Sequence, residues 1–474
     1  MKGREISFVN AEATGAKAKK TSQVAIILAN QAPQGGNFMP ELARVGTLPV
    51  LLRAILGAKS AQANRIMVVV DSVRARTIQR ELFKTDRVPE CVEWIVAEEG
   101  SETLSHVMRL AAEDADQLVL MVGDRTYNPS LHRMTQEWVG EEGALAMEDS
   151  SGPVGMVALS SSLALRLADN HPWQFTSIED IYRWIALRKT LRSHSGSALY
   201  SVSSQQWQRI NTPADCAAAE RKLDTWLMKP TDGIFARTNR RISIPISRWL
   251  IKYPITPNMV TYFTLGVSIA AGVFYGLGGY WNMLVAAILS LWASILDGCD
   301  GEVARLKMQS SDFGCWLETV CDYLYYLFIF TGMAVGFARH TGNRAYLLWG
   351  GALLFGAAFT VVLALIGRRR LSGDRPEQYL KKWQENAERR ASNPIMYIGR
   401  YTEFMVRRCF LPYPFLVFAI LNITQVGFFL AAVGANIAWM ISLYSNRLFL
   451  RKRPAVVLCS SDRVGNTVSM EAQP

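Results

Sequence analysis

The sequence predicts an N-terminal α/β domain followed by an all-α domain of six transmembrane helices. Two observations lead to this prediction: short β-branched runs alternate with helical patterns in the first half, and long uncharged runs occur only in the second. The chain has 474 residues, of which 50% are hydrophobic, and a net charge of +11. This composition excludes a disordered chain, a collagen and a disulfide scaffold, and it suggests that apolar and basic residues are segregated.

The uncharged runs set the number of membrane spans. The longest, Tyr253–Leu296, has 44 residues and is interrupted by the turn-forming sequence Gly278-Gly279-Tyr280. Because a helix crosses a bilayer with about 20 apolar residues, this run holds two spans. Buried helices of a soluble protein would not explain why four such runs follow a half that has none. We expect six spans, near residues 258–277, 281–299, 314–337, 345–367, 409–424 and 426–446.

Lys and Arg set the orientation, since cytoplasmic loops carry an excess of both. The segment 368–408 has 11 of them against five acids, whereas only Arg339 and Arg344 lie in loops on the opposite side. We therefore expect an integral protein of the cytoplasmic (inner) membrane, in contact with membrane lipids, with both termini in the cytoplasm. Met1–Lys20 has no apolar stretch typical of a signal peptide. The seven Cys show no paired spacing, and no nucleic-acid partner is expected.

The first half has the pattern of a domain in which strands alternate with helices. Val24–Leu28, Ile66–Val70 and Gln117–Val122 are short apolar runs, separated by helical patterns such as Pro49–Ala58. This alternation predicts a parallel α/β sheet, and such sheets bind ligands at the carboxyl ends of their strands. Asp124 follows the third run directly, so it is a candidate ligand residue, although an Asp in a turn is the simpler explanation.

These segments resemble the sugar-nucleotidyltransferase family, which implies a Rossmann-like fold; Val45–Leu51 and Thr212-Pro213-Ala214-Asp215 also fit its pattern. The resemblance implies a Gly-rich phosphate loop with an Arg, a Pro-Lys step, and a second metal-binding Asp beside Asp124. This chain has instead Asn30–Gly36, Pro40-Glu41 and Arg209-Ile210-Asn211. We therefore expect a degenerate domain kept for structure, regulation or nucleotide binding. The alternative is an active cytidylyltransferase.

We place this domain, called the head below, in residues 1–228, and a basic amphipathic segment follows in 229–257. Arg and Lys alternate there with Ile and Trp, which favours a helix lying flat in the cytoplasmic interface against anionic lipid headgroups. An ordinary linker helix is the alternative. The membrane domain is expected in residues 258–450 and a cytoplasmic tail in 451–474.

Four carboxylates stand at the ends of the second and third predicted spans. Asp297 and Asp300 are three positions apart, and Glu318 and Asp322 are four apart, so each pair lies on one helix face. Ionisable groups at membrane depth are costly and are functional candidates. Hard divalent cations would neutralise their repulsion, because carboxylate oxygens suit Mg²⁺ and Mn²⁺. The sequence therefore predicts a metal site formed by these four residues.

The same segment is similar to the signature of the CDP-alcohol phosphotransferases, also called CDP-alcohol phosphatidyltransferases. The signature has fixed spacing and falls on Asp297, Asp300, Gly301, Ala304, Arg305, Gly314, Glu318 and Asp322. Glu318 is its one departure, because it replaces an Asp and adds a methylene. Thr256-Pro257-Asn258, which precedes the first span, also looks like this family.

The resemblance implies transfer of a substituted phosphate from a CDP-alcohol to an acceptor hydroxyl, with release of CMP. Two ions of Mg²⁺ or Mn²⁺ would be held by Asp297, Asp300, Glu318 and Asp322. Asp322 would also be the catalytic general base toward the acceptor. The nucleotide would contact Gly301, Ala304, Arg305, Gly314, Thr256, Pro257 and Asn258.

The acceptor is less constrained. Arg368, Arg369 and Arg370 follow the fourth span and are candidates to bind the phosphate of an inositol phosphate, although positive-inside charge is the simpler explanation. The tandem with the head resembles bifunctional enzymes that make CDP-inositol and join it to a second inositol phosphate. The eroded head makes a CDP-diacylglycerol donor and a role in phospholipid biosynthesis an equal expectation.

Two other classes of protein are alternatives to the enzyme. A transporter would have carboxylates at the midplane and internal repeats, and the sequence shows neither. A non-catalytic membrane protein that binds nucleotides is the remaining alternative. A homodimer is compatible with either the enzyme or the binding protein.

Overall fold

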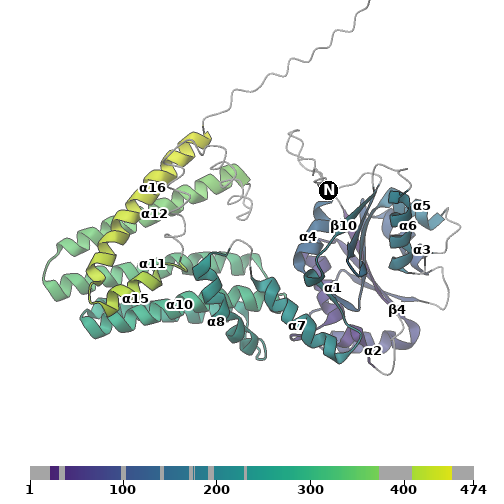
Figure 1. The fold of residues 1–474 in the computed structure, drawn as a ribbon, viewed down its shortest axis with the longest axis horizontal. Helices are drawn as coiled ribbons and strands as arrows, with labels where there is room; N and C mark the ends of the chain where they lie inside the picture. Colours follow the sequence, from purple (N-terminus) through teal and green to yellow (C-terminus); the bar gives the residue numbers. More distant parts are fainter. Residues whose placement is uncertain are drawn as a thin grey trace, which may run out of the picture. The chain divides into compact units, whose positions relative to one another are not determined.

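The computed structural model describes residues 22–30, 38–97, 103–138, 143–169, 175, 177–190, 197–228, 232–372 and 408–450. The chain divides into two compact units (Figure 1). The first is Met1–Phe263 together with Ile295–Glu318, and the second is Thr264–Ser294 together with Thr319–Pro474.

The head is built on a seven-stranded sheet whose central strands are aliphatic and buried. A strand covered on both faces has no side that needs polar residues, which explains the unbroken apolar runs. β1 pairs in parallel with β4 and β6, and β4 with β5. The strand order is β10 (Ser197–Ser201), β8 (Ala144–Asp149), β9 (Gly152–Ser160), β6 (Gln117–Val122), β1 (Gln23–Ala29), β4 (Arg65–Asp71) and β5 (Val92–Ala97).

The expectation of a parallel sheet is wrong at one strand, because β9 lies between β8 and β6 and runs antiparallel to both. Only Ser150 and Ser151 separate β8 from β9. A link of two residues can join antiparallel strands but not parallel ones, which need a crossover of a dozen residues or more. The head is therefore a mixed α/β domain.

Helices cover both faces of the sheet (Figure 1). Alternate residues of β1 supply the two cores: Ala25 and Ile27 face the core that includes α1, α2 and α4, and Val24 and Ile26 face the core of α3, α5 and α6. The helices of the head are α1 (Val50–Ser60), α2 (Ser72–Phe83), α3 (Thr103–Glu113), α4 (Pro129–Glu137), α5 (Ser161–Asp169), α6 (Ile178–Thr190) and α7 (Pro213–Leu227).

Short elements complete the head. Two small antiparallel pairs are β2 (Arg44–Val45) with β3 (Leu48–Pro49), and β7 (Arg125–Tyr127) with β11 (Trp207–Arg209). Two 3-10 helices are η1 (Pro40–Leu42) and η2 (Ser204–Gln206).

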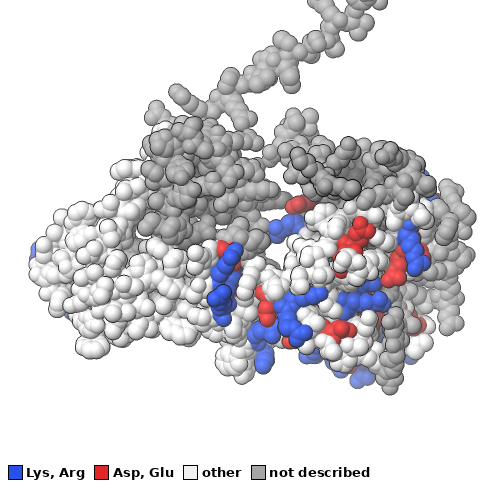
Figure 2. Space-filling model, viewed as in Figure 1, with Lys and Arg blue, Asp and Glu red and all other residues white. Residues whose placement is uncertain are grey.

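Five helices of the described residues are long and apolar enough to cross a membrane. Large apolar side chains such as Trp281, Leu348 and Leu430 are exposed on them. On the face in Figure 2, charged residues gather on the head and are nearly absent from this helical region. The helices are α9 (Pro257–Leu277), α10 (Tyr280–Leu306), α11 (Asp312–Thr341), α12 (Ala345–Ser372) and α16 (Thr424–Leu450).

The predicted span at 409–424 is not confirmed by the structure. The helix found there, α15 (Pro412–Ile420), has 9 residues, fewer than half of what a bilayer crossing needs. Pro412 and Pro414 stand in its first turn, where Pro is tolerated but does not continue a helix backward. Residues 373–407 lie outside the described residues, and they include most of the basic loop, the segment 368–408.

The amphipathic segment forms α8 (Ile234–Leu250), with Pro245 inside it. Its polar stripe is buried: Asn239, Ser243 and Ser247 are at most 6% exposed. Its apolar side chains Ile234 and Trp249 are instead 80% and 56% exposed. The exposed face also carries Arg237 and Arg241, and Ile244 is buried, so the interfacial position of α8 stays a prediction.

Candidate active site

Asp300 is anchored at the end of α10. Its side chain is 5% exposed, and its Oδ2 accepts a hydrogen bond of 2.7 Å from the Thr261 hydroxyl of α9. Its Oδ1 accepts one from the Gly301 backbone N–H. Asp297 lies one turn earlier and is half-buried. The helix thus holds two carboxylates on one side, as the spacing of three predicts.

The proposed nucleotide residues come together in part. The Thr256 hydroxyl accepts a long hydrogen bond of 3.4 Å from the Met259 N–H at the start of α9. A Cβ added to Gly314 would lie 3.3 Å from the Asn258 Oδ1 and 3.1 Å from the Ser311 Oγ. The start of α11 therefore packs closely against the start of α9 at Gly314, and these two signature segments are neighbours.

Arg305 carries a buried donor with no partner among the described residues. Its Nε is inaccessible and makes no hydrogen bond there. Asp300, Glu302 and Glu318 all lie within electrostatic reach of its guanidinium. A buried, unsatisfied guanidinium N–H is costly, and an incoming phosphate oxygen would relieve that cost with a charge-assisted hydrogen bond.

Glu302 is a functional candidate that the sequence reasoning missed. It is 0% exposed and accepts hydrogen bonds from the Ser243 hydroxyl (2.6 Å), the Ser247 hydroxyl (2.7 Å) and Arg240 (3.2 Å), all on α8. Arg240 also pairs with Asp232. The two Ser lie four positions apart, a spacing that could have indicated one helix face awaiting an acceptor. This network fastens α8 to the signature helix.

The two carboxylates of the second pair, Glu318 and Asp322, lie in different surroundings. Glu318 is exposed and belongs to the first unit, whereas Asp322 belongs to the second. Asp322 pairs with Arg408, whose guanidinium carbon lies 4.4 Å from the centre of the Tyr325 ring. The sequence reasoning counted Arg408 only among the charges of the basic loop.

The donor set fits a hard divalent cation, because all four predicted ligands are carboxylates. Within the described ranges, no three His, Cys, Asp or Glu side chains already form a group that could hold a metal ion. Asp300 and Asp322 have protein partners instead, namely Thr261 and Arg408. The metal site therefore stays a prediction.

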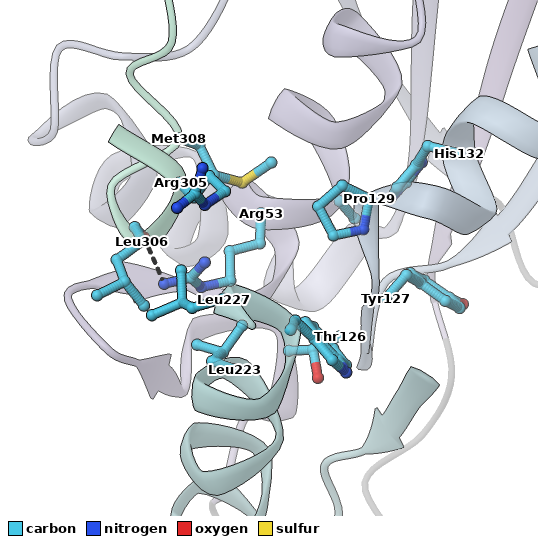
Figure 3. Close-up of a pocket in the computed structure, with 12 residues that line it drawn as sticks. Arg53, Thr126, Tyr127, Pro129, His132, Leu223, Leu227, Arg305, Leu306 and Met308 are labelled. Carbon is cyan, nitrogen blue, oxygen red and sulfur yellow. Dashed lines mark hydrogen bonds between the residues drawn. The ribbon is translucent and has the colours of Figure 1, made fainter. Parts of the chain in front are cut away.

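A cavity of ≈ 50 Å³ lies beside Arg305 within the first unit (Figure 3). Arg53 and His132 of the head line it together with Leu306 and Met308. His132 is buried, and desolvation lowers its pKa to about 4, so its imidazole is neutral at pH 7. The cavity is too small for a nucleotide.

Asp124 of the head faces two arginines instead of a metal. It is 5% exposed, and its two carboxylate oxygens lie 3.3 Å from the Arg125 Nε and 3.3 Å from the Arg209 Nε. Burial raises its pKa, and the two arginines partly offset that effect. Arg209 stands where the nucleotidyltransferase pattern implies a second metal-binding Asp.

The three arginines proposed for the acceptor phosphate fall within the last turns of α12. The side chains of Arg368, Arg369 and Arg370 lie outside the described residues. Their predicted role is therefore neither supported nor opposed by the structure. The same applies to the loop after β1, since residues 31–37 are not described.

The buried Asp300 carboxylate and the unsatisfied Arg305 donor both lie near the end of α10, within one signature segment. Residues 254–388 match the CDP-alcohol phosphatidyltransferase family. This match agrees with the resemblance that the spacing of the signature predicted.

Three curated relatives are similar to part of the chain. Over 131 residues, 27% of this chain, it is 37% identical to a bifunctional IPC transferase and DIPP synthase from Aquifex aeolicus, and covers 29% of that protein. Over 179 residues, 36% of this chain, it is 31% identical to the protein of that name from Rubrobacter xylanophilus, and covers 39% of it. Over 129 residues, 26% of this chain, it is 31% identical to a phosphatidylinositol phosphate synthase from Cutibacterium acnes, and covers 59% of it. The chain thus spans well under half the length of the bifunctional relatives.

Solved structures are similar to the first part of the chain. The inositol-1-phosphate CTP transferase from T. maritima aligns with 43% of this chain and 95% of its own, at 13% identity and a TM-score of 0.33. A 4-diphosphocytidyl-2C-methyl-D-erythritol synthase from Anaerococcus prevotii aligns with 43% of this chain and 96% of its own, at 14% identity and the same TM-score.

Proposed function

We propose that the protein is an integral-membrane transferase that moves a substituted phosphate group from a CDP-alcohol to an acceptor alcohol and releases CMP. One observation carries this proposal: the complete signature spacing, with Asp300 buried and anchored and Arg305 holding an unsatisfied donor. The family match over residues 254–388 supports the same activity.

Asp297, Asp300, Glu318 and Asp322 are the residues that would hold two ions of Mg²⁺ or Mn²⁺. Such ions, when bound, would neutralise the diphosphate and stabilise the departing phosphate oxygen. Glu318 would reach its ligand position with a longer side chain than the Asp of the signature.

The chain's own residues have separate tasks. Arg305 would donate to a phosphate oxygen, and Asn258 with Gly314 would line the cytidine side of the donor site, together with Thr256, Pro257, Gly301 and Ala304. Asp322 would accept the proton of the attacking hydroxyl. Arg408, which pairs with Asp322, would hold that carboxylate in position.

The donor is CDP-diacylglycerol or CDP-inositol, and an inositol phosphate is the acceptor class that best matches Arg368, Arg369 and Arg370. Similarity to a phosphatidylinositol phosphate synthase supports inositol chemistry. We also propose that residues 258–450 form the membrane domain, that α8 lies in the interface, and that the N-terminus lies in the cytoplasm at the inner membrane, with the protein a monomer or a homodimer.

The head is proposed to be degenerate as a nucleotidyltransferase. Two arginines neutralise Asp124, one of them in place of the expected second metal ligand. A bound metal would have to displace both guanidinium groups from a buried carboxylate. The head therefore needs another role.

The proposal is tested by incubating the purified full-length protein with Mg²⁺ or Mn²⁺ and a panel of CDP-alcohols and acceptors. Mass spectrometry should find CMP together with one phosphodiester product for at least one pair. Absence of CMP across CDP-diacylglycerol, CDP-inositol and further CDP-alcohols would overturn the proposal. Pyrophosphate release from CTP would instead favour the bifunctional alternative.

A further inference from the structure

The signature helix α10 ends in a specific hydrogen-bonding pattern. The Met308 N–H donates to the Arg305 carbonyl and the Gln309 N–H donates to the Ala304 carbonyl, which is the Schellman arrangement at a helix C-terminus. Met308 takes the left-handed conformation there, with φ of 51°, although Gly is the usual residue. The Lys307 N–H pairs with the Val303 carbonyl. Of the last four carbonyls of α10, that of Leu306 receives none of these backbone bonds.

The head supplies the missing donor. Arg53 of α1 donates from a terminal guanidinium nitrogen to the Leu306 carbonyl at 2.8 Å, a bond drawn in Figure 3, and from Nε to the Val45 carbonyl at 2.9 Å. Its side chain is buried, and desolvation lowers its pKa to about 10, so it remains charged at pH 7. A cation at a helix C-terminus also interacts favourably with the helix dipole.

The position of Arg53 is fixed by its neighbours. Gly46 has φ of 65°, and a Cβ there would lie 2.9 Å from the Arg53 terminal nitrogen. The Gly46 N–H donates to Glu220 of α7. In the sequence, Val45–Leu51 fits a nucleotidyltransferase pattern. In the structure, the loop at Gly46 in this segment instead positions the Arg53 guanidinium, which points at α10.

Two further contacts hold the same turn. Arg87 of the head donates to the Met308 carbonyl at 3.0 Å. Val303 and Leu306 share a hydrophobic cluster with residues of the head that include Val45, Val50 and Ile210. The head therefore contacts the end of α10 by both polar and apolar groups.

The turn is connected onward to the nucleotide residues. The Lys307 ammonium donates to the Tyr253 carbonyl at 2.7 Å and to the Ile255 carbonyl at 2.8 Å. Ile255 immediately precedes Thr256-Pro257-Asn258. Arg305, with its unsatisfied Nε, is two residues before Lys307. Displacement of the α10 end would therefore shift both groups proposed to contact the donor nucleotide.

We propose that the head has become a positioning domain for the transferase, with Arg53 as the positioning residue that caps α10 and sets Arg305 and the loop before α9. This inference rests on the proposed transferase function for its kinetic consequence. It does not require the head to bind or convert a nucleotide. Arg53 contacts the backbone of the signature helix α10 and is not proposed to contact substrate. It therefore acts through Arg305.

The kinetic test compares Arg53→Met, Arg53→Lys and Arg76→Met in the full-length protein. Arg76 is an exposed arginine of α2 and serves as the matched control. Arg53→Met should raise the KM for the CDP-alcohol about tenfold and change kcat less, because Asp322 belongs to the other unit. Arg53→Lys should restore part of the affinity, since an ammonium still donates to a carbonyl. An unchanged KM in Arg53→Met would overturn the proposal.

Hydrogen exchange gives a readout independent of activity. In Arg53→Met, amides of residues 303–309 should exchange about tenfold faster, while those of β1 and β6 keep the wild-type rate. If the amides of β1 and β6 also exchange faster, the substitution has damaged the head itself. The test is then repeated with Arg87→Met, which removes the donor to the Met308 carbonyl. Wild-type exchange at 303–309 in the folded variant would refute the capping role. Absence of CMP release by the wild type would refute only the proposed function.

Discussion

Replacement of Asp124 by Asn should destabilise the head and leave the transferase activity unchanged. The substitution removes a buried charge that faces two guanidinium groups at 3.3 Å each. Removal of one partner from a buried ion pair costs about 3–5 kcal/mol. The lower end applies here, because Arg125 keeps Glu179 at 3.3 Å and the side chain of Arg209 is 32% exposed. We expect a loss of about 3 kcal/mol in the free energy of unfolding.

Pulse proteolysis of the full-length protein in urea measures this loss, because the protease digests the unfolded head and spares the folded one. Asp114→Asn is the matched control: Asp114 pairs with Arg65 at 2.9 Å but its side chain is 68% exposed, and exposed pairs contribute about 0–1 kcal/mol. Equal stability of Asp124→Asn and the wild type would refute the buried-pair reasoning. Asp124-dependent release of pyrophosphate from CTP would refute the degenerate head.

Three further predictions concern other parts of the chain. Burial lowers the pKa of His132 to about 4 from 6.5. As the pH falls, the unfolded chain therefore protonates His132 before the folded chain does. The head should lose up to about 3 kcal/mol as pH falls from 6.5 to 4, and His132→Phe should flatten that dependence in urea titrations. Glu302→Leu should lower the free energy of unfolding by about 3 kcal/mol and lower CMP release, because Arg240 and two serines lose their acceptor. When Ser243→Ala and Ser247→Ala are added to Glu302→Leu, the triple variant should regain thermal stability. Gly336→Ala would place its Cβ against the Tyr275 carbonyl and should abolish a monodisperse peak in size-exclusion chromatography, but Gly351→Ala, which faces open space, should not.

Local sequence patterns were sufficient to predict much of the fold. The apolar runs of β1, β4 and β6 and the long uncharged helices were predicted because strand burial and bilayer length act on contiguous residues. The antiparallel β9 was missed because the hairpin Ser150-Ser151 has the same composition as any loop. The short α15 was missed because an uncharged run does not reveal where a helix begins.

The candidate site divides in the same way. The signature residues could be identified from spacing alone, and Asp300 is buried and anchored as a ligand residue needs to be. The Glu302 network, the Asp322–Arg408 pair and the Arg53 cap join residues 55, 86 and 253 positions apart. No periodicity encodes such contacts, because each depends on how separate elements pack.

The most direct test of the transferase account is metal-dependent CMP release by the purified full-length protein and by two aspartate variants. Asp300→Ala removes a buried signature carboxylate, and Asp312→Ala removes an exposed one outside the signature at the start of α11. The account predicts that wild type and Asp312→Ala release CMP when Mg²⁺ or Mn²⁺ is present, and that Asp300→Ala releases none although it folds. CMP release by Asp300→Ala at the wild-type rate would contradict it.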